Sequence, residues 1–420
     1  MKKVITTTLM MCSMAASALT PAPAAKPVDQ VFINANIHVG NGEVLENAQF
    51  AISDGKISRA GYYRMALDGS EIDLKGQHIY PGFILASTNL GLTEVDSVKA
   101  TIDATETGQL NPNVRALIAY NTDSERIPTM RFNGILLAQT TPSGGLVSGT
   151  SSVVQLDAWN WEDAVVKADD GLHINWPAEW SKRFDFSTFT MQLKKDDKYT
   201  EKTDQIKALL ADARSTGHDN NVKLNAVKPV FSGQKKVFIH TNNPKSIIEA
   251  ISHIKSMGID DPVLVTGQAA GSVIEFLQEQ QISVIINGTH ALPQLSDDSI
   301  DERYSLPARL LQAGIQTALT YPGSMSSRNL AFAAGSTVAY GLSTEQALQM
   351  ITGTAAQILG IDDQYGTLEV GKSATFFISQ GDALDMRGNV VEQAYIDGRP
   401  VELHTRQQEL YERYKEKYDQ

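Results

Sequence analysis

Short runs of alternating apolar and polar residues mark both ends of the chain. Residues 31–39 and 48–53 alternate in this way, and Asp54-Gly55 follows the second run. Asp-Gly after an alternating run indicates a hairpin turn, because both residues tolerate positive φ. The same pattern returns late in the chain, with a second Asp-Gly turn (374–379, 391–396, Asp397-Gly398). The two ends are therefore predicted to build one small β domain together.

The middle of the chain has the pattern of βα units, in which short apolar strands alternate with helical segments. Eight runs are strand candidates: 83–86, 134–138, 152–156, 172–175, 237–240, 263–266, 283–286 and 316–320. Eight is the number of strands that closes a TIM-like barrel. We therefore predict an α/β fold with these parts: a (β/α)8 barrel over 80–361, a composite β-sandwich over 26–79 and 362–403, and a charged C-terminal helix over 404–420.

Two long stretches carry neither a strand pattern nor a clear helix pattern. They cover residues 90–127 and 159–202, and each follows a predicted strand end. Long insertions at such ends form the roof of a pocket in barrel proteins. Elsewhere the helices are well delimited, as at Ser343-Thr-Glu-Gln346, which has the capping-box pattern.

The first 25 residues differ from the rest of the chain. Lys2-Lys3 precede an almost uncharged stretch, and Ala22-Pro23-Ala24 has a small-x-small cleavage pattern. We interpret residues 1–25 as a secretory signal peptide, cleaved after Ala24 or Ala18, and expect the protein in the periplasm. A lipoprotein signal ending at Cys12 is the alternative, which the bulky Met11 disfavours. Cys12 is the single cysteine, so a disulfide scaffold is excluded.

The net charge narrows the choice of partner. The whole chain carries −12, and removal of Lys2 and Lys3 takes this to −14, because the first 25 residues contain no acid. An acidic surface argues against nucleic acid or an anionic membrane as the partner. No run after residue 25 reaches the roughly 18 apolar residues of a spanning helix, so no membrane span is expected.

One stretch resembles a known family. Residues 79–94, with Pro81-Gly82-Phe83-Ile84 at the start of a strand, resemble the entry to the catalytic barrel of the amidohydrolase superfamily, in particular its imidazolonepropionase-like members. Residues 366–372 resemble the segment that returns to the β domain in that family. The resemblance implies a hydrolase of carbon–nitrogen bonds, such as a cyclic amide or a small peptide, with zinc or another divalent metal as cofactor.

The resemblance also points to metal-ligand positions, and most of them carry other residues here. The family's first strand ends in His-x-His, where this chain has Ser87 and Asn89, and the ends of strands six and eight carry Thr266 and Tyr321. His240, at the end of strand five, is the one match. A catalytic zinc needs about three protein ligands. The usual binuclear site is therefore expected to be largely missing, with His240 as its one remaining metal-ligand candidate.

A different constellation can replace that site. His290 follows strand seven and Asp157 follows strand three, so both are predicted to share the barrel rim with His240. A histidine pair with carboxylates can bind a metal or act as acid and base. Acids of the first long loop are further candidates, although loop acids are usually only solvated: Glu94, Asp96, Asp103 and Glu106. His173 lies on strand four, and the sequence does not tell which way it faces.

Aromatic residues and one arginine are candidates for the substrate pocket. All four tryptophans follow strands three and four: Trp159, Trp161, Trp176 and Trp180. They either wall a pocket or form a small core for the long insertion. Arg328, after strand eight, either contacts substrate or caps the barrel.

Two classes of function follow from these observations. The first is a periplasmic amidohydrolase-type enzyme acting on a small molecule. The second is a barrel that has lost hydrolysis and binds a small molecule or serves as the partner subunit of an active homologous amidohydrolase. A homo-oligomer is compatible with either class, and fold alone does not decide between them.

Overall fold

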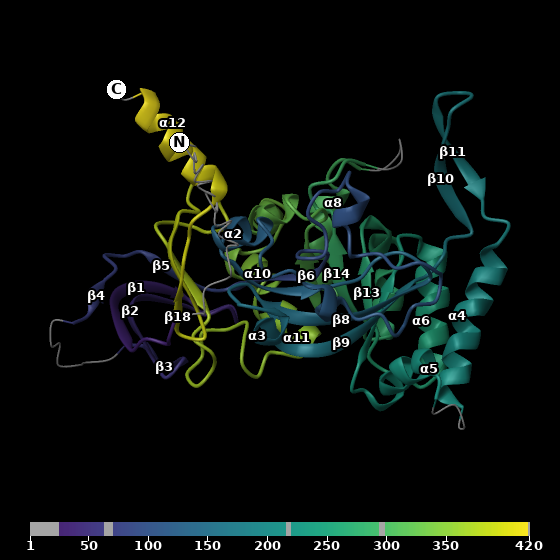
Figure 1. Cartoon of the computed structure of the whole chain (residues 1–420), viewed down its shortest axis with the longest axis horizontal. Coiled ribbons are helices and arrows are strands. Elements are labelled where there is room, and N and C mark those ends of the chain that lie inside the picture. The colour runs from purple at the N-terminus through teal and green to yellow at the C-terminus, as the bar shows by residue number, and fades with distance from the viewer. Residues whose placement is uncertain (1–24, 63–69, 216–219, 294–298, 419–420) are drawn as a thin grey trace, which may run out of the picture.

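The computed structural model describes residues 25–62, 70–215, 220–293 and 299–418 (Figure 1). The predicted signal peptide lies almost entirely outside the described residues. No helix within the described ranges is both long enough and apolar enough to cross a membrane.

Eight strands form the central sheet, in the order β15-β14-β13-β12-β9-β8-β7-β6. The two edge strands approach each other, and the Thr320 hydroxyl on β15 donates to the Ala86 carbonyl on β6, so the sheet is a nearly closed barrel. The predicted mixed α/β class and barrel are confirmed. The strands are β6 (Phe83–Thr88), β7 (Ile135–Thr140), β8 (Val147–Gln155), β9 (Val165–Asn175), β12 (Lys236–His240), β13 (Val263–Thr266), β14 (Ser283–Asn287) and β15 (Thr317–Thr320).

The third barrel strand departs from the regular βα pattern. β8 runs antiparallel to both β7 and β9, whereas the remaining neighbours in the barrel are parallel. Only residues 141–146 separate β7 from β8. A parallel connection needs a dozen or more residues, so this short segment permits only an antiparallel return. The carboxyl end of β8 therefore lies at the opposite end of the barrel from the other carboxyl ends.

A second sheet joins the two ends of the chain. Its order is β18-β17-β16-β5-β1-β2-β3, and β4 pairs with β1. β16 pairs antiparallel with β5, which brings Phe377 opposite Tyr80. The pairing shows one sheet built from both chain ends, while its division into a two-layer sandwich stays a prediction. The strands are β1 (Gln30–His38), β2 (Val44–Ser53), β3 (Lys56–Gly61), β4 (Ile72–Asp73), β5 (His78–Pro81), β16 (Phe376–Ser379), β17 (Val391–Ile396) and β18 (Arg399–Val401).

Helices surround the barrel and close the end opposite the carboxyl ends of its parallel strands. α10 (Thr344–Gln349) begins with the predicted capping box, in which Ser343 and Gln346 bond each other's backbone. α11 (Gly353–Leu359) supplies Ala355 and Ile358 to the apolar interior below Ile84 and Phe238. The other helices are α1 (Ala116–Ala119), α2 (Arg126–Arg131), α3 (Trp161–Ala164), α4 (Tyr199–Arg214), α5 (Val222–Val227), α6 (Pro244–Ser256), α7 (Ile274–Glu279), α8 (Glu302–Gln312) and α9 (Leu330–Val338), with 3-10 turns η1 (Lys99–Thr101), η2 (Lys228–Ser232), η3 (Gln268–Ser272) and η4 (Ser326–Asn329).

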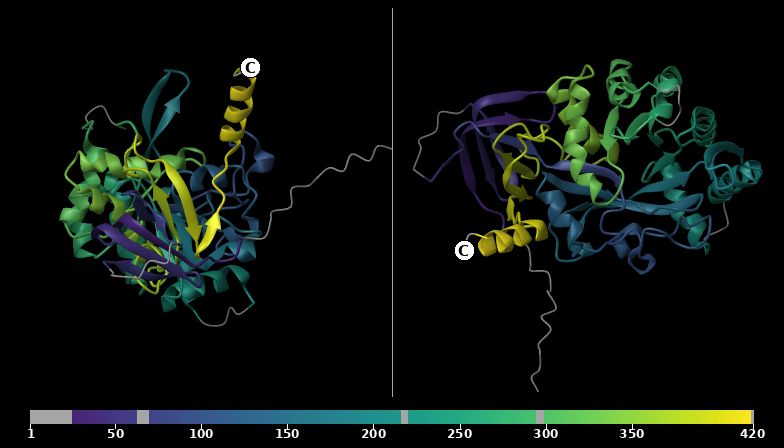
Figure 2. Two further views of the ribbon diagram at one scale, coloured as in Figure 1. Left: turned by 90° about the vertical axis from the view of Figure 1, so that its left-hand side faces the viewer. Right: turned by 90° about the horizontal axis from the view of Figure 1, so that it is seen from above.

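Two elements project from the same side of the body (Figures 1 and 2). One is the hairpin of β10 (Trp180–Asp185) and β11 (Thr190–Lys195), which forms a sheet of its own. The other is α12 (Arg406–Tyr418), which has no buried residue. The stretch 159–202, predicted as a pocket roof, is thus divided among α3, β9, the hairpin and the start of α4.

Candidate functional site

Two histidines meet inside the barrel near its mouth. β9 and β12 are parallel, with His173 opposite Phe238 and Asn175 opposite His240. Side chains alternate along a strand, so His173 and Asn175 face the same side as His240. The His173 Nδ1 and His240 Nε2 atoms lie 2.8 Å apart, a hydrogen bond between two imidazoles. His173 is therefore a functional candidate whose direction the sequence left open.

The surroundings keep both imidazoles neutral. The His173 ring is fully buried and stacks on Phe238, with 4.7 Å between ring centroids. Burial lowers the pKa of His240 to about 4, and it lowers the pKa of His173 well below its usual value. A neutral imidazole carries one N–H and one acceptor nitrogen, so one ring donates to the other. The His173 Nε2 atom is also buried, yet it has no hydrogen-bond partner.

A second polar cluster links the neighbouring strands β6, β7, β8 and β9. The Gln139 amide donates to Asp170 Oδ2 at 2.7 Å, and the Ser151 hydroxyl donates to Asp170 Oδ1 at 2.7 Å. The Gln139 carbonyl oxygen accepts from the Ser87 backbone N–H at 3.0 Å. Burial raises the pKa of Asp170 to about 6, even though these hydrogen bonds oppose the rise. This cluster fixes the carboxyl ends of β6 and β7 relative to each other.

Ser87 and Asn89 stand at the end of β6, where the resemblance placed metal ligands. The backbone of Ser87 has a φ of 48°, a left-handed conformation that is uncommon for a residue other than glycine. The Asn89 amide donates to the Thr93 hydroxyl at 3.3 Å, within the loop that follows. Strain of this kind gathers at functional sites, and here it coincides with an irregularity in the pairing of β6 with β7.

Thr266 and Tyr321 complete the set of substituted positions. The Thr266 hydroxyl lies 3.4 Å from the Asn242 side-chain oxygen, which also accepts from backbone N–H groups just after β13. The Tyr321 hydroxyl lies 3.4 Å from His290 Nδ1. These contacts give both side chains roles in holding loops at the rim.

The structure does not bring the predicted companions to His240. His290 is exposed, and its Nε2 atom bonds the Ser336 hydroxyl of α9 at 2.8 Å. It thereby lines a cavity of about 360 Å³ between α9 and residues 382–386. Asp157 pairs with Arg131 at 2.5 Å and lies 3.8 Å from Arg399. Because β8 is antiparallel, Asp157 lies at the opposite end of the barrel, where it joins the barrel to the terminal sheet.

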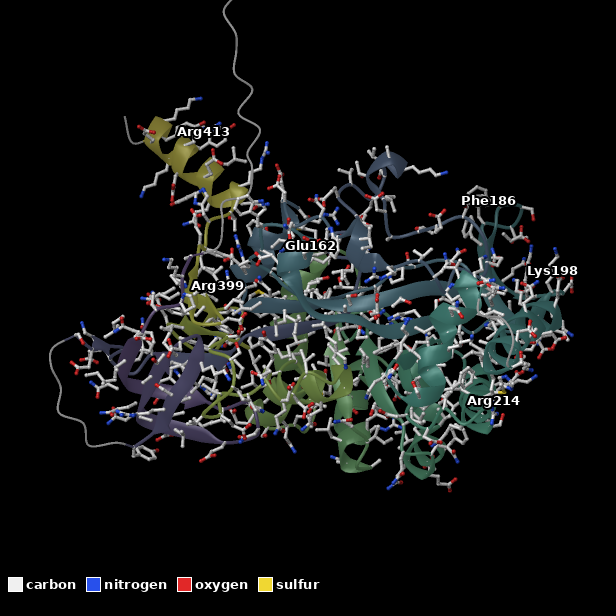
Figure 3. All side chains as sticks on the ribbon, turned by 60° about the horizontal axis from the view of Figure 1, so that its bottom comes forward. Glu162, Phe186, Lys198, Arg214, Arg399 and Arg413 are labelled. Atoms are coloured by element: carbon white, nitrogen blue, oxygen red, sulfur yellow. The ribbon has the colours of Figure 1, made fainter. Side chains whose placement is uncertain are left out.

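The tryptophans separate into different environments. Trp159 lines a cavity of about 540 Å³ with Arg399 at the sheet end, the region labelled by Arg399 in Figure 3. Trp161 is partly buried against the main core, and Trp176 is buried, with its backbone N–H donating to the His240 carbonyl. Trp180 lies on the projecting hairpin. Their closeness in sequence therefore does not create one aromatic wall.

Arg328 is oriented by its own turn. Its guanidinium donates to the Met325 carbonyl at 3.0 Å, just before α9. Both roles that the sequence offered for Arg328, substrate contact and capping of the barrel, stay predictions.

The donor set does not fit a catalytic zinc. Across the described ranges, no three residues among His, Cys, Asp and Glu lie together in a way that can hold a metal ion. His173 and His240 use two of their nitrogens on each other. The substituted positions offer hydroxyl and amide oxygens, which bind zinc poorly beside imidazole or thiolate.

Comparisons with known proteins find a partial family match and several similar folds. The amidohydrolase family model matches residues 307–401. No curated protein sequence matches the chain. An amidohydrolase from Thermotoga maritima MSB8 is 22% identical, with 89% of this chain and 99% of that chain covered and a TM-score of 0.77. A putative prolidase from Bifidobacterium longum is 15% identical, with 93% and 100% covered and a TM-score of 0.55. A Xaa-Pro dipeptidase with bound methionine is 11% identical, with 89% and 100% covered and a TM-score of 0.54.

Proposed function

We propose that this chain belongs to the amidohydrolase superfamily and that its barrel mouth binds a small amide or peptide-like molecule without metal-dependent hydrolysis. The family-model match over residues 307–401 and the similarity of fold to an amidohydrolase support this proposal. The observation that carries the proposal is the neutral His173–His240 pair, in which the two imidazoles bond each other at 2.8 Å. In this proposal the binuclear site of the family is degenerate, and the barrel retains the recognition of an amide.

The chemistry of the mouth suits a neutral polar ligand. His173 Nε2 is buried and unsatisfied, and a buried polar nitrogen gains when a ligand supplies its hydrogen-bond partner. Thr266 adds a hydroxyl at the end of the neighbouring strand β13, and Ser87 and Asn89 add a hydroxyl and an amide at the end of β6. An amide offers both a carbonyl acceptor and an N–H donor, so it matches a site whose groups both donate and accept.

Hydrolysis of an amide is the second candidate, and the names of the structural neighbours favour it. They include prolidases, a molinate hydrolase and a phenylurea hydrolase. Against it stands the low pKa of His240, about 4, which makes this imidazole a weak proton acceptor. A general base works best when its pKa lies near the working pH. Tyr321, at the end of strand eight, has its hydroxyl 3.4 Å from His290 Nδ1.

Location and partners belong to the same proposal. Lys2-Lys3 and the uncharged stretch after them support export to the periplasm. N-terminal sequencing of the protein from a periplasmic fraction tests this, and an uncleaved chain in the cytoplasm contradicts it. A complex with a homologous amidohydrolase would make this chain a partner subunit, and co-purification from the native host at stoichiometric amounts tests that version.

Thermal-shift and calorimetric titrations with N-acyl amino acids and Xaa-Pro dipeptides test the binding function. We expect saturable binding that is lost in His240→Ala and kept in His290→Ala, the matched histidine that lines a separate cavity against α9. Product analysis of the same mixtures should show intact ligand. Amide cleavage that depends on an added divalent metal would overturn the proposal in favour of the hydrolase.

A further inference from the structure

The hairpin of residues 180–195, here called the arm, is a two-stranded sheet that projects away from the body (Figures 1 and 2). Its register runs from Trp180 opposite Lys195 to Asp185 opposite Thr190. A two-stranded hairpin without a third strand or a covering helix is marginally stable in water. The arm therefore has the properties of an element that another surface covers.

Three phenylalanines form an exposed apolar cluster at the end of the arm. Phe184 is 43% exposed, Phe186 80% and Phe189 78%. The Phe184 ring lies 5.1 Å from Phe186 and 6.0 Å from Phe189, and both contacts are edge-to-face. Leu193 adds a further side chain that is 63% exposed. Large exposed apolar clusters mark protein or membrane interaction sites.

Behind the aromatic end, the arm carries a tryptophan and lysines. Lys195 lies 6.0 Å from the centre of the Trp180 ring and 3.4 Å from Glu179. Lys194 is exposed on the arm, and Lys198 is exposed just after it, at the start of α4. The neighbouring Asp196 pairs with Lys202 at 2.5 Å. Tryptophan and lysine behind an apolar end are the arrangement found at membrane interfaces, where the ring and the cations meet the headgroups.

α12 forms a second projection on the same side. It ends at about the same level as the arm in both side views (Figures 1 and 2), and Figure 3 labels Phe186 and Arg413 on the two projections. Tyr411 is 64% exposed, Tyr414 57% and Tyr418 78%, a spacing that places them along one side of the helix. Two separate projections that end at one level can both touch a flat surface, whereas a compact pocket can receive only one of them.

We propose that the arm and α12 dock this protein on an anionic phospholipid bilayer. The phenylalanines enter the boundary between headgroups and acyl chains, about 5–10 Å deep for such interfacial elements. Lys194 and Lys198 then lie near the lipid phosphates. The net charge of −12 means that an anionic membrane repels the body of the protein as a whole. Docking is therefore confined to the two projections, which hold the body away from the lipid.

Vesicle flotation of the purified protein tests the proposal. We expect binding to phosphatidylcholine vesicles that contain about 30% phosphatidylglycerol, and weak binding to pure phosphatidylcholine, because each lysine near an anionic surface adds roughly fivefold in affinity. Phe186→Ser with Phe189→Ser should lower the partition coefficient roughly 10- to 100-fold. Lys194→Gln with Lys198→Gln should lower the affinity for the anionic vesicles roughly 25-fold, about fivefold per lysine.

The control removes equally exposed apolar side chains elsewhere. Val222, on α5 at the far edge of the body, is 70% exposed, and Val370 is 58% exposed. Val222→Ser with Val370→Ser should leave vesicle binding unchanged. Failure of the parent protein to float with anionic vesicles overturns the proposal. A dimer in light scattering that the phenylalanine double variant dissociates would assign the arm to a protein interface instead.

Discussion

Asp170→Asn tests the energetics of the buried cluster. Asp170 is 2% exposed and accepts hydrogen bonds from Gln139 and Ser151. Burial raises the pKa of its carboxyl from 3.8 to about 6. At about 1.4 kcal/mol per pH unit, ionisation of this group costs the folded state about 3 kcal/mol at neutral pH relative to the unfolded chain. Asparagine keeps the shape and removes the ionisation.

The sign of this effect follows from proton binding. Between about pH 4 and pH 6 the folded chain holds the Asp170 proton and the unfolded chain has lost it, so stability falls as the pH rises through this window. His240 acts in the opposite direction, because its lowered pKa makes stability fall as the pH drops from 6.5 to about 4. In the parent protein, the pH dependence of stability that Asp170 contributes opposes the one that His240 contributes. Asp170→Asn removes the first and keeps the second.

Urea unfolding followed by circular dichroism measures the result. We expect Asp170→Asn to be more stable than the parent by up to about 3 kcal/mol near pH 8, and about equal near pH 4. Asp212→Asn, which changes an exposed aspartate of α4, should show no such difference between the two pH values. Equal destabilisation of Asp170→Asn at both pH values would show that the charged carboxylate is needed, and would refute the reasoning.

Three further changes give distinct outcomes. His240→Ala leaves His173 Nδ1 buried without its partner and should cost about 1–3 kcal/mol in urea unfolding, whereas an unchanged midpoint would mean that the imidazole pair adds nothing to stability. Gly171→Ala places a Cβ against the Phe238 ring and should cost about 1–3 kcal/mol, and a neutral result would show that the barrel interior yields freely. Ser87→His with Asn89→His should raise zinc affinity in competition titrations without giving amide turnover, because the site offers no side chain that can act as the general base. Fast turnover by this variant would contradict this view of the site.

The barrel strands were predictable because strands buried on both faces read as continuous apolar runs. The direction of β8 was not, for a specific reason. Its first half is buried but polar, with Ser148, Thr150, Ser151 and Ser152, so the strand starts at Val147 without an apolar pattern. From the apolar part alone, the gap after β7 appears long enough for a crossover. The misplacement of Asp157 follows directly from that hidden start.

The residues of the candidate site were also only partly predictable from the sequence. His240 was predictable because it ends an apolar run, and the end of such a run lies at the barrel mouth. His173 was missed because its role depends on the facing of β9, which the register with β12 determines. One sequence signal was present: Asn175 ends the strand at the rim, so His173, two positions earlier, faces the same side. The separation of His290 from His240 depends on a loop contact with α9, which no local pattern encodes.

The metal content of the purified protein tests the central claim most directly. The protein is incubated with excess zinc, desalted and measured by elemental analysis alongside its protein concentration. A mouth with two mutually bonded imidazoles and neutral oxygen donors is predicted to retain far less than one zinc per chain. Retention of one or two zinc ions per chain by the parent protein, but not by His240→Ala, would contradict the account. It would favour the function of a metal-dependent amidohydrolase instead.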